Sequence, residues 1–202
     1  MDDVDALKPK VEQVIAMQQP TRGSTPQAAG MPPPPPERFL FADDGTVPNN
    51  PTLPFLVYRQ AVKLEGAADP AAVIEQRFGE NGWGRSWRDG IFPYVHYHSR
   101  VHEVLGVARG HARVRFGGAN GAELELAAGD VAVLPAGTGH QRLAASDDLL
   151  VVGAYPPEGE YDEFRGSAEE HARARLTIPQ VPLPAADPLH GRTGPLTRLW
   201  KR

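Results

Sequence analysis

The sequence predicts an all-β fold organised around one barrel. Two observations carry this prediction. From Gly90 onward, apolar residues alternate with polar residues at a period of two, which is typical of strands with one buried face. Glycine or proline separates most of these runs, and many short strands at nearly even spacing favour a sandwich or barrel. The seven runs cover residues 91–98, 102–108, 111–117, 122–127, 130–134, 138–144 and 148–155.

A strand and a helix are expected before the barrel. Pro54–Tyr58 is apolar and begins with a proline, as an edge strand can. Asp69 followed by Pro70 predicts a helix start, because Asp caps helices well and proline fits the first helical position. Residues 79–82 contain two glycines and are expected to end this helix. One of its faces is apolar and carries Val73, Ile74 and Phe78.

The two ends of the chain differ from the barrel in composition. Residues 1–37 contain few apolar anchors and the run Pro32–Pro36, so we expect a disordered proline-rich tail. Residues 38–157 are assigned to the barrel with its preceding strand and helix. Residues 158–202 are expected to form a helix near 167–176 and an extended proline-rich tail.

Composition excludes several classes of protein. The chain has no cysteine, which rules out disulfides, thiolate metal sites and iron–sulfur clusters. A net charge of -4 gives no electrostatic reason to bind nucleic acid or anionic membranes. The start of the chain lacks the apolar run of a signal peptide or membrane span. We therefore expect a cytoplasmic protein without a nucleic-acid or membrane partner.

Histidines concentrate in the barrel and predict a metal site. His96 and His98 are two residues apart, which places both imidazoles on one face of a strand. Glu103 begins the next run, and a hairpin can return its carboxylate to the same ion. His140 follows the turn at 135–139 and supplies a third imidazole. Surface histidines are the alternative, but three imidazoles with a carboxylate favour a metal centre.

The spacing of these residues resembles the two motifs of the cupin superfamily. The first motif consists of a glycine, five residues, HxH, three or four residues, a glutamate, six residues and a second glycine. Its fixed positions are Gly90, His96, His98, Glu103 and Gly110 in this sequence. The second motif consists of a glycine, five residues, PxG, two residues, a histidine, three residues and an asparagine. Gly129, Pro135, Gly137 and His140 match it. Ala144 replaces the final Asn, which is not a metal ligand. The resemblance implies a double-stranded β-helix, or jelly-roll, barrel with a metal site.

The wider pattern is similar to the YjlB-like branch of bacterial single-domain cupins. The segments DDGTVPNNPTLP, HYHSRVHEVLGVARG, AGDVAVLPAGTGH and DPLHGRTGPL carry this likeness. It supplies a fold and a metal site without a substrate. Cupins are often dimers, so the resemblance also implies a homodimer.

Ligand chemistry narrows the metal to a divalent transition ion. Three imidazoles and one carboxylate without sulfur suit iron, manganese, cobalt, nickel, copper or zinc. Four ligands would close a tetrahedral zinc site, whereas a six-coordinate ion keeps two open positions. We therefore favour iron or manganese.

Three further residues are candidates for the surroundings of the ion. Phe92 and Tyr94 share the parity of His96 along a regular strand, so they are expected to line the pocket or fill the barrel. His102 has the opposite parity to Glu103, which favours a supporting or surface role. A role for His102 as an alternative ligand stays open.

The sequence supports two main functions. The first is a metal-dependent enzyme acting on a small polar molecule, with dioxygenation as the leading reaction and isomerisation second. The alternative is a non-catalytic cupin that binds or senses a small molecule, because no general acid or base accompanies the ligands in the motifs. A third hypothesis is a scaffold protein with a proline-rich interaction segment, and the intact ligand set argues against it.

Overall fold

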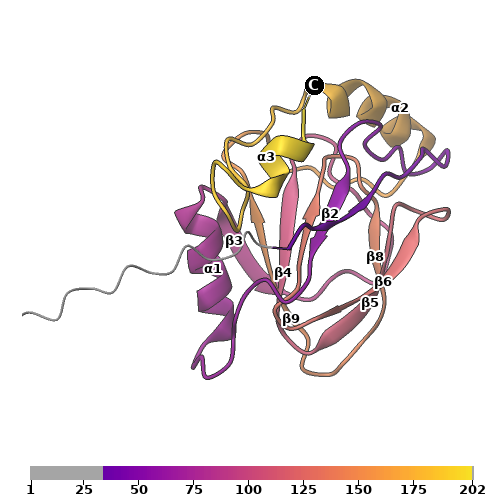
Figure 1. Ribbon diagram of the computed structural model, residues 1–202. Helices are drawn as coiled ribbons and strands as arrows, with labels where there is room; N and C mark the ends of the chain where they lie inside the picture. Colours follow the sequence, from indigo (N-terminus) through magenta and orange to yellow (C-terminus); the bar gives the residue numbers. More distant parts are fainter. Residues whose placement is uncertain (1–33, 202) are drawn as a thin grey trace, which may run out of the picture. The chain divides into compact units, whose positions relative to one another are not determined.

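The computed structural model describes residues 34–201 (Figure 1). Two antiparallel sheets form its centre, with orders β1-β2-β7-β4-β9-β3 and β6-β5-β8. The larger sheet contains β1 (Glu37–Phe39), β2 (Phe55–Tyr58), β3 (Gly84–Asp89), β4 (Glu103–Arg109), β7 (Val131–Leu134) and β9 (Leu150–Tyr155). The smaller sheet contains β5 (His111–Phe116), β6 (Ala122–Ala127) and β8 (His140–Ala145). This arrangement confirms the predicted all-β barrel.

Alternation along β4 separates two layers of the core. Leu105 and Val107 face the inside of the barrel, where they join the inner apolar cluster with Phe116 of the smaller sheet. Val104 and Ala108 point the other way and join an outer cluster. Both faces of β4 are buried, so Glu103, with the parity of Leu105, starts the strand on the inner side.

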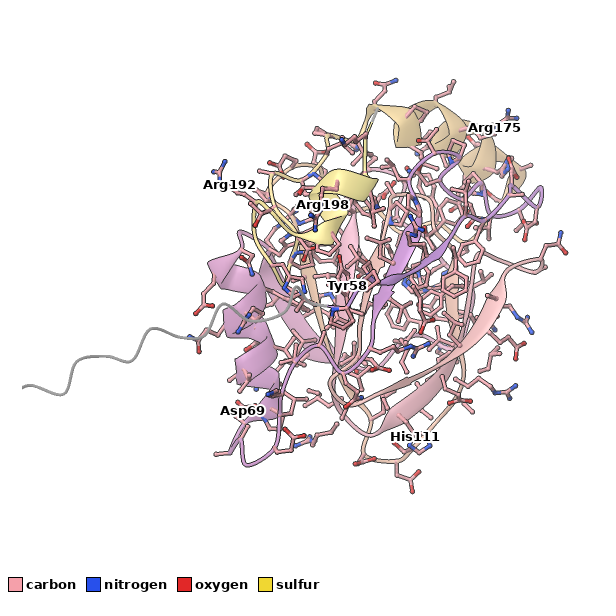
Figure 2. All side chains as sticks on the ribbon, in the orientation of Figure 1. Tyr58, Asp69, His111, Arg175, Arg192 and Arg198 are labelled. Carbon is pink, nitrogen blue, oxygen red and sulfur yellow. The ribbon has the colours of Figure 1, made fainter. Side chains whose placement is uncertain are left out.

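Helix α1 (Pro70–Glu80) covers the outer face of the larger sheet (Figure 1). Its predicted start is confirmed: the Asp69 side chain accepts a hydrogen bond from the backbone N–H of Ala72, and Pro70 occupies the first turn. Figure 2 shows Asp69 at one end of the helix. Ile74 and Phe78 are fully buried against the sheet.

One strand prediction is wrong, and β3 was not predicted. Residues 91–98 form no regular strand; only isolated bridges occur there, at His96 and Tyr97. Pro93 has no backbone N–H to give to a ladder, which interrupts this segment. The sequence also gave no sign of β3, because GRSWRD is mostly exposed and lacks apolar alternation. β3 forms as an edge strand on β9, and the other six predicted runs match strands.

The C-terminal residues lie against β2. Asp187 is fully buried and accepts hydrogen bonds from the Tyr58 hydroxyl at 2.6 Å and from the N–H groups of Leu189 and Leu196. Trp200 donates from its indole nitrogen to the carbonyl of Pro54 at 2.8 Å. The segment contains α2 (Ala168–Thr177), η1 (Ile178–Gln180) and α3 (Pro195–Leu199), so it is less extended than expected.

The predicted disordered tail, residues 1–37, lies mostly outside the described residues. Its last residue, Glu37, begins β1 and forms an ion pair with Arg59 at 2.8 Å. Within residues 34–201, no helix has the length and apolar character needed to span a membrane.

The close approach of α1 to β4 depends on Gly106. A Cβ atom at this position would lie 2.7 Å from Cγ2 of Ile74. We expect Gly106→Val to lower the free energy of unfolding by about 1–3 kcal/mol, because the side chain would overpack the interface. Gly84→Val is the matched control, since a Cβ there meets nothing within 4 Å. Denaturant titration measures both, and equal stabilities would contradict this packing.

Candidate metal centre

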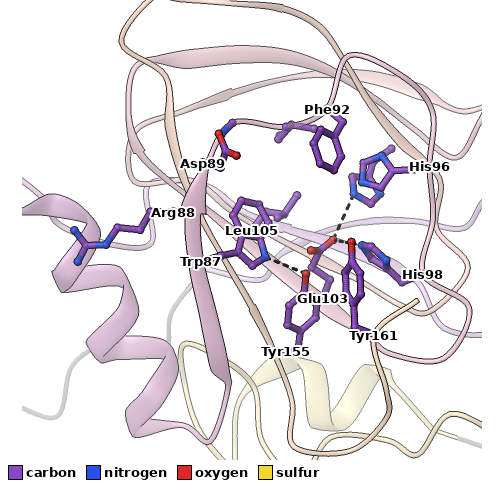
Figure 3. A pocket seen from close by; sticks show the side chains of 13 residues that line it. Trp87, Arg88, Asp89, Phe92, His96, His98, Glu103, Leu105, Tyr155 and Tyr161 are labelled. Carbon is purple, nitrogen blue, oxygen red and sulfur yellow. Dashed lines mark hydrogen bonds and ion pairs between the residues drawn. The ribbon is translucent and has the colours of Figure 1, made fainter. Parts of the chain in front are cut away.

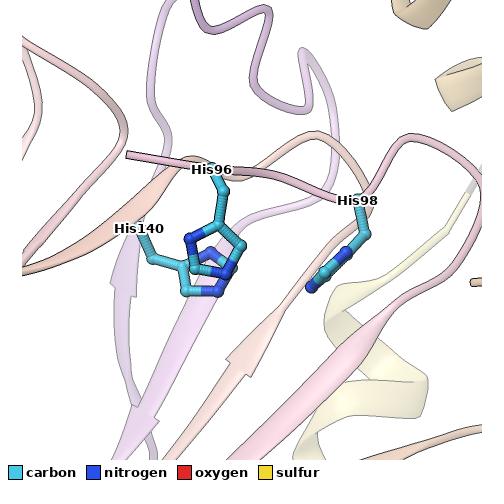
Figure 4. Close-up of side chains that lie close together, drawn as sticks. All are labelled: His96, His98 and His140. Carbon is cyan, nitrogen blue, oxygen red and sulfur yellow. The ribbon is translucent and has the colours of Figure 1, made fainter. Parts of the chain in front are cut away.

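The three predicted histidines meet at one end of the barrel (Figure 4). His96 and His140 face each other across an antiparallel bridge, with N–H···O distances of 3.2 and 2.9 Å. His98 lies two residues further along, and its carbonyl accepts a hydrogen bond from the N–H of Gly137. One nitrogen of each ring lies within 4.8 Å of the others, and all three residues are buried. This cluster could hold a metal ion.

Glu103 reaches the same space from the start of β4. Its Oε2 lies 3.4 Å from Nε2 of His98 and 3.4 Å from Nε2 of His140. The atom is buried and has no hydrogen-bond partner among the described residues. Burying a carboxylate oxygen without a hydrogen-bond partner costs free energy. A cation bound between this oxygen and the two imidazole nitrogens would offset that cost.

The other ring nitrogen of each histidine is held by the backbone. Nδ1 lies 3.3 Å from the carbonyl oxygen of Tyr94 in His96 and 3.2 Å from that of Thr138 in His140. Nδ1 of His98 bonds in the same way to the carbonyl of Asp162. A carbonyl only accepts, so each Nδ1 carries the hydrogen. In a neutral ring, Nε2 then presents its lone pair, as metal-binding histidines do.

Burial and mutual charge set the protonation of this group. Burial alone would raise the pKa of Glu103, but the charges of the neighbouring histidines, first of all His98, hold it at about 2. Burial opposes charge on His98 too, yet the facing carboxylate raises the pKa of this imidazole. Burial and neighbouring histidines lower the pKa of His140 to about 3 and also lower that of His96. Two rings are therefore neutral beside one ionised carboxylate.

The donor set fits a divalent transition metal. It offers three imidazole nitrogens and one carboxylate oxygen and contains no sulfur. Such ligands suit first-row divalent ions. The backbone carbonyls that orient the rings provide the outer hydrogen bonds that tune metal sites.

A cavity of about 380 Å³ opens beside the cluster (Figure 3). Trp87 forms part of its wall and donates from its indole nitrogen to the Tyr155 hydroxyl at 2.9 Å. The indole lies directly over Gly153, where an added Cβ would be only 2.1 Å from it. The lining residues are Trp87, Arg88, Asp89, Gly90, Ile91, Phe92, His96, His98, Glu103, Leu105, His140, Tyr155 and Tyr161.

The loop before His140 packs against Asn49 and Asn50, which precede β2 in the sequence. Gly137 has a φ of 95°, in the region that favours glycine, and an added Cβ would lie 2.7 Å from the carbonyl oxygen of Asn49. The side chain of Asn50 donates to the carbonyl of Ala136 at 3.1 Å. The turn-rich stretch before β2 therefore positions the third histidine.

The three residues predicted to surround the ion, Phe92, Tyr94 and His102, lie in different places. Phe92 lines the cavity. Tyr94 does not line it; its ring stacks on Phe92 at 4.9 Å, and Arg165 lies over it. His102 is the main correction, because it faces away from the cavity and stacks on Trp200 at 4.8 Å.

Both ring nitrogens of His102 are used elsewhere. Nδ1 accepts from the N–H of Ala136 at 2.9 Å, and Nε2 bonds to the carbonyl of Pro182 at 3.2 Å. A role for His102 as an alternative metal ligand is therefore wrong. The parity argument correctly placed it on the opposite face, where it is buried and not at the surface.

Sequence reasoning missed three aromatic residues of the cavity. Trp87, Tyr155 and Tyr161 all line the cavity, and none of them was among the predicted surroundings of the ion. Tyr155 ends β9 and follows an apolar run, so its position on the inner face could have been read from strand parity. Tyr161 lies in irregular chain after β9, where no periodicity applies.

Comparison with known proteins identifies the family. No family model matches the sequence. The uncharacterized protein YjlB of Bacillus subtilis (strain 168) is 42% identical over 164 residues, which cover 81% of this chain and 96% of YjlB. The chain belongs to the YjlB family. The likeness to the YjlB-like branch, inferred from four segments of the sequence, is thereby confirmed.

Solved structures match this YjlB family member over smaller shares of the chain. Acireductone dioxygenase from Bacillus anthracis, with a cadmium ion in its active centre, has a TM-score of 0.35 and 20% identity over 50% of this chain and 70% of that one. A mutant of the oxalate decarboxylase OxdC from Bacillus subtilis has a TM-score of 0.34 and 20% identity over 57% of this chain. The match covers 28% of the decarboxylase chain.

The structural role of His102 can be tested by its removal. We expect His102→Ala to lower the free energy of unfolding by about 2–3 kcal/mol, because the N–H of Ala136 and the carbonyl of Pro182 would lose a buried partner. His111→Ala is the control, since His111 is exposed at the start of β5, the central strand of the smaller sheet (Figure 2). Urea titration gives both values, and a loss below about 0.5 kcal/mol for His102→Ala would refute this role.

Proposed function

We propose that this YjlB-like cupin binds a divalent transition metal through His96, His98, His140 and Glu103, and that it acts as a metal-dependent enzyme. The observation that carries the proposal is the cluster of three oriented imidazoles, two of which, those of His98 and His140, have Nε2 at 3.4 Å from the buried Oε2 of Glu103. Iron or manganese suits this donor set best, with nickel, cobalt, zinc and copper as the other candidates.

The reaction would take place in the cavity beside the ligands. A bound metal would supply Lewis acidity, a template for the substrate and access to redox chemistry. The Glu103 carboxylate would offset part of the ion's charge. The largely apolar wall of the cavity would limit the access of water to the ion. These features support a dioxygenase first and an isomerase second.

The hydroxyl groups of the cavity are suited to donating hydrogen bonds. Burial and the facing Glu103 carboxylate raise the pKa of Tyr155. Burial and Glu163 raise the pKa of Tyr161 to about 12. Both phenols therefore stay protonated at neutral pH and cannot serve as general bases.

The absence of a base among these phenols also supports the alternative function. A cupin that only binds or senses a small molecule needs a metal and a pocket and no proton acceptor. Oxygen uptake by the Fe(II)-loaded protein with candidate substrates separates the two. Turnover supports the enzyme, whereas saturable ligand binding with no uptake and no product supports the binder.

Metal content is the direct test of the site. We expect the purified protein to hold about one divalent metal per chain and His98→Ala to lose most of it, because one imidazole ligand is gone. His111→Ala should retain the metal, since His111 lies outside the cluster. Elemental analysis after gel filtration measures all three proteins. The same occupancy in wild type and His98→Ala would disprove the assignment.

The charge of Glu103 is tested by Glu103→Gln. We expect the barrel to stay folded and metal affinity to fall by at least about tenfold, the smallest loss typical of altering groups around a metal. The amide oxygen still reaches the ion but is neutral and a weaker donor. Competition with a chelator gives the affinity, and circular dichroism checks the fold. An unchanged affinity would remove Glu103 from the ligand set.

A further inference from the structure

Most hydrogen-bonding groups of the cavity gather at one end, and Asp89 lies apart from them (Figure 3). Glu103 and the three histidines form that end, and the Tyr155 hydroxyl lies beside them, accepting from Trp87. The remaining wall is mainly apolar or aromatic and is made by Trp87, Ile91, Phe92, Leu105 and the rings of Tyr155 and Tyr161. A ligand that matches this wall has one polar edge for the metal and an apolar body.

No free cationic side chain faces this cavity among its lining residues. Arg88 is the one arginine or lysine in the lining, and its guanidinium points outward (Figure 3). It forms ion pairs with Asp69 at 2.9 Å and with Glu75 at 2.5 Å. The lining also contains two acidic side chains, those of Glu103 and Asp89. A dicarboxylate ligand would therefore have only the metal to balance its charge.

Two exposed aromatic rings flank the histidines. The ring of Phe92 lies 5.2 Å from that of His96, and Phe92 is 42% exposed. The ring of Tyr161 lies 4.9 Å from that of His98, and Tyr161 is 52% exposed. Large aromatic residues exposed at a pocket are typical of binding surfaces. They offer ring faces and edges to a planar ligand at the polar end of the cavity.

We propose that the ligand of this site is an uncharged aromatic molecule with two adjacent oxygen donors, of the size of one or two rings. This inference rests on the proposed metal site. Four protein ligands leave a six-coordinate ion two positions, which adjacent oxygens can occupy together. The aromatic body then contacts Phe92, Tyr161 and Trp87. A cavity of about 380 Å³ is at the small end of the range for ligand sites, about 300–1,000 Å³.

This class differs from the small polar molecule expected from the sequence. A polar ligand without a ring would leave the rings of Phe92 and Tyr161 unused and would lose water without gaining partners along the apolar wall. An aromatic diol keeps its polar atoms at the metal end, where the hydrogen-bonding groups of the cavity lie.

Ligand binding to the Co(II)-loaded full chain tests the proposal, because cobalt gives a visible spectrum that responds to ligands. The probes are catechol, cis-cyclohexane-1,2-diol and oxalate, titrated without oxygen. We expect catechol to bind at least about tenfold more tightly than either of the others. The non-aromatic diol keeps the two oxygens but removes both the ring and the acidity of the phenols, so the rim variants described next isolate the ring contact. Oxalate keeps two donor oxygens and adds charge.

Substitutions at the rim identify the residues involved. Phe92→Ala and Tyr161→Ala should each weaken catechol binding by roughly three- to tenfold, the size of one aromatic contact. Tyr161→Phe should restore wild-type affinity because it keeps the ring. Leu176→Ala is the matched control: Leu176 is 71% exposed on α2 and does not line the cavity. Cobalt content and circular dichroism are measured on every variant.

The outcomes separate the two proposals. A wild-type protein that binds no cobalt disproves the metal site and with it this inference. A protein that binds cobalt but prefers oxalate, or binds the two diols equally, overturns the aromatic ligand and leaves the metal site standing. Catechol affinity unchanged in both alanine variants likewise overturns it.

Discussion

The convergence of Glu103 and three imidazoles inside one end of the barrel is the constraint on which the rest of the structure depends. A carboxylate removed from water must face compensating charge or hydrogen bonds. The protein brings two neutral rings and one ring with a raised pKa to that carboxylate. Each ring is fixed by a backbone carbonyl from a different stretch of chain, at Tyr94, Thr138 and Asp162. Three loops must therefore be held in place at once.

The two-layer core meets this requirement. Inward residues of β4 fill the barrel and carry Glu103 on the same face, while outward residues bind α1 and the C-terminal segment. The loop before His140 gains support from Asn49 and Asn50, which lie far away in the sequence. His102 extends the same support from the outer side, by accepting from Ala136. The stability of the outer layer and the position of the ligands are thus linked through one loop.

The fold and the candidate ligands could be predicted because they depend on local periodicity and spacing. Leu124 and Leu126 alternate with acidic residues, and β6 forms there; His96 and His98 have the separation that places two rings together. The missed features depend on tertiary contacts. β3 exists through its pairing with β9 and not through its own pattern. Tyr161 reaches the cavity from irregular chain, and Tyr94 stacks on Phe92 without lining the cavity itself.

The carbonyl supports of the histidines limit how this pocket can diverge among relatives. Phe92 lies two residues before Tyr94, whose carbonyl holds His96, and Tyr161 immediately precedes Asp162, whose carbonyl holds His98. An insertion or deletion in either rim segment would shift a carbonyl and turn its imidazole away. Replacement of the rim side chains leaves the backbone in place. Side chains at the rim are therefore expected to change by substitution at constant segment length, while the arrangement of the three histidines stays the same.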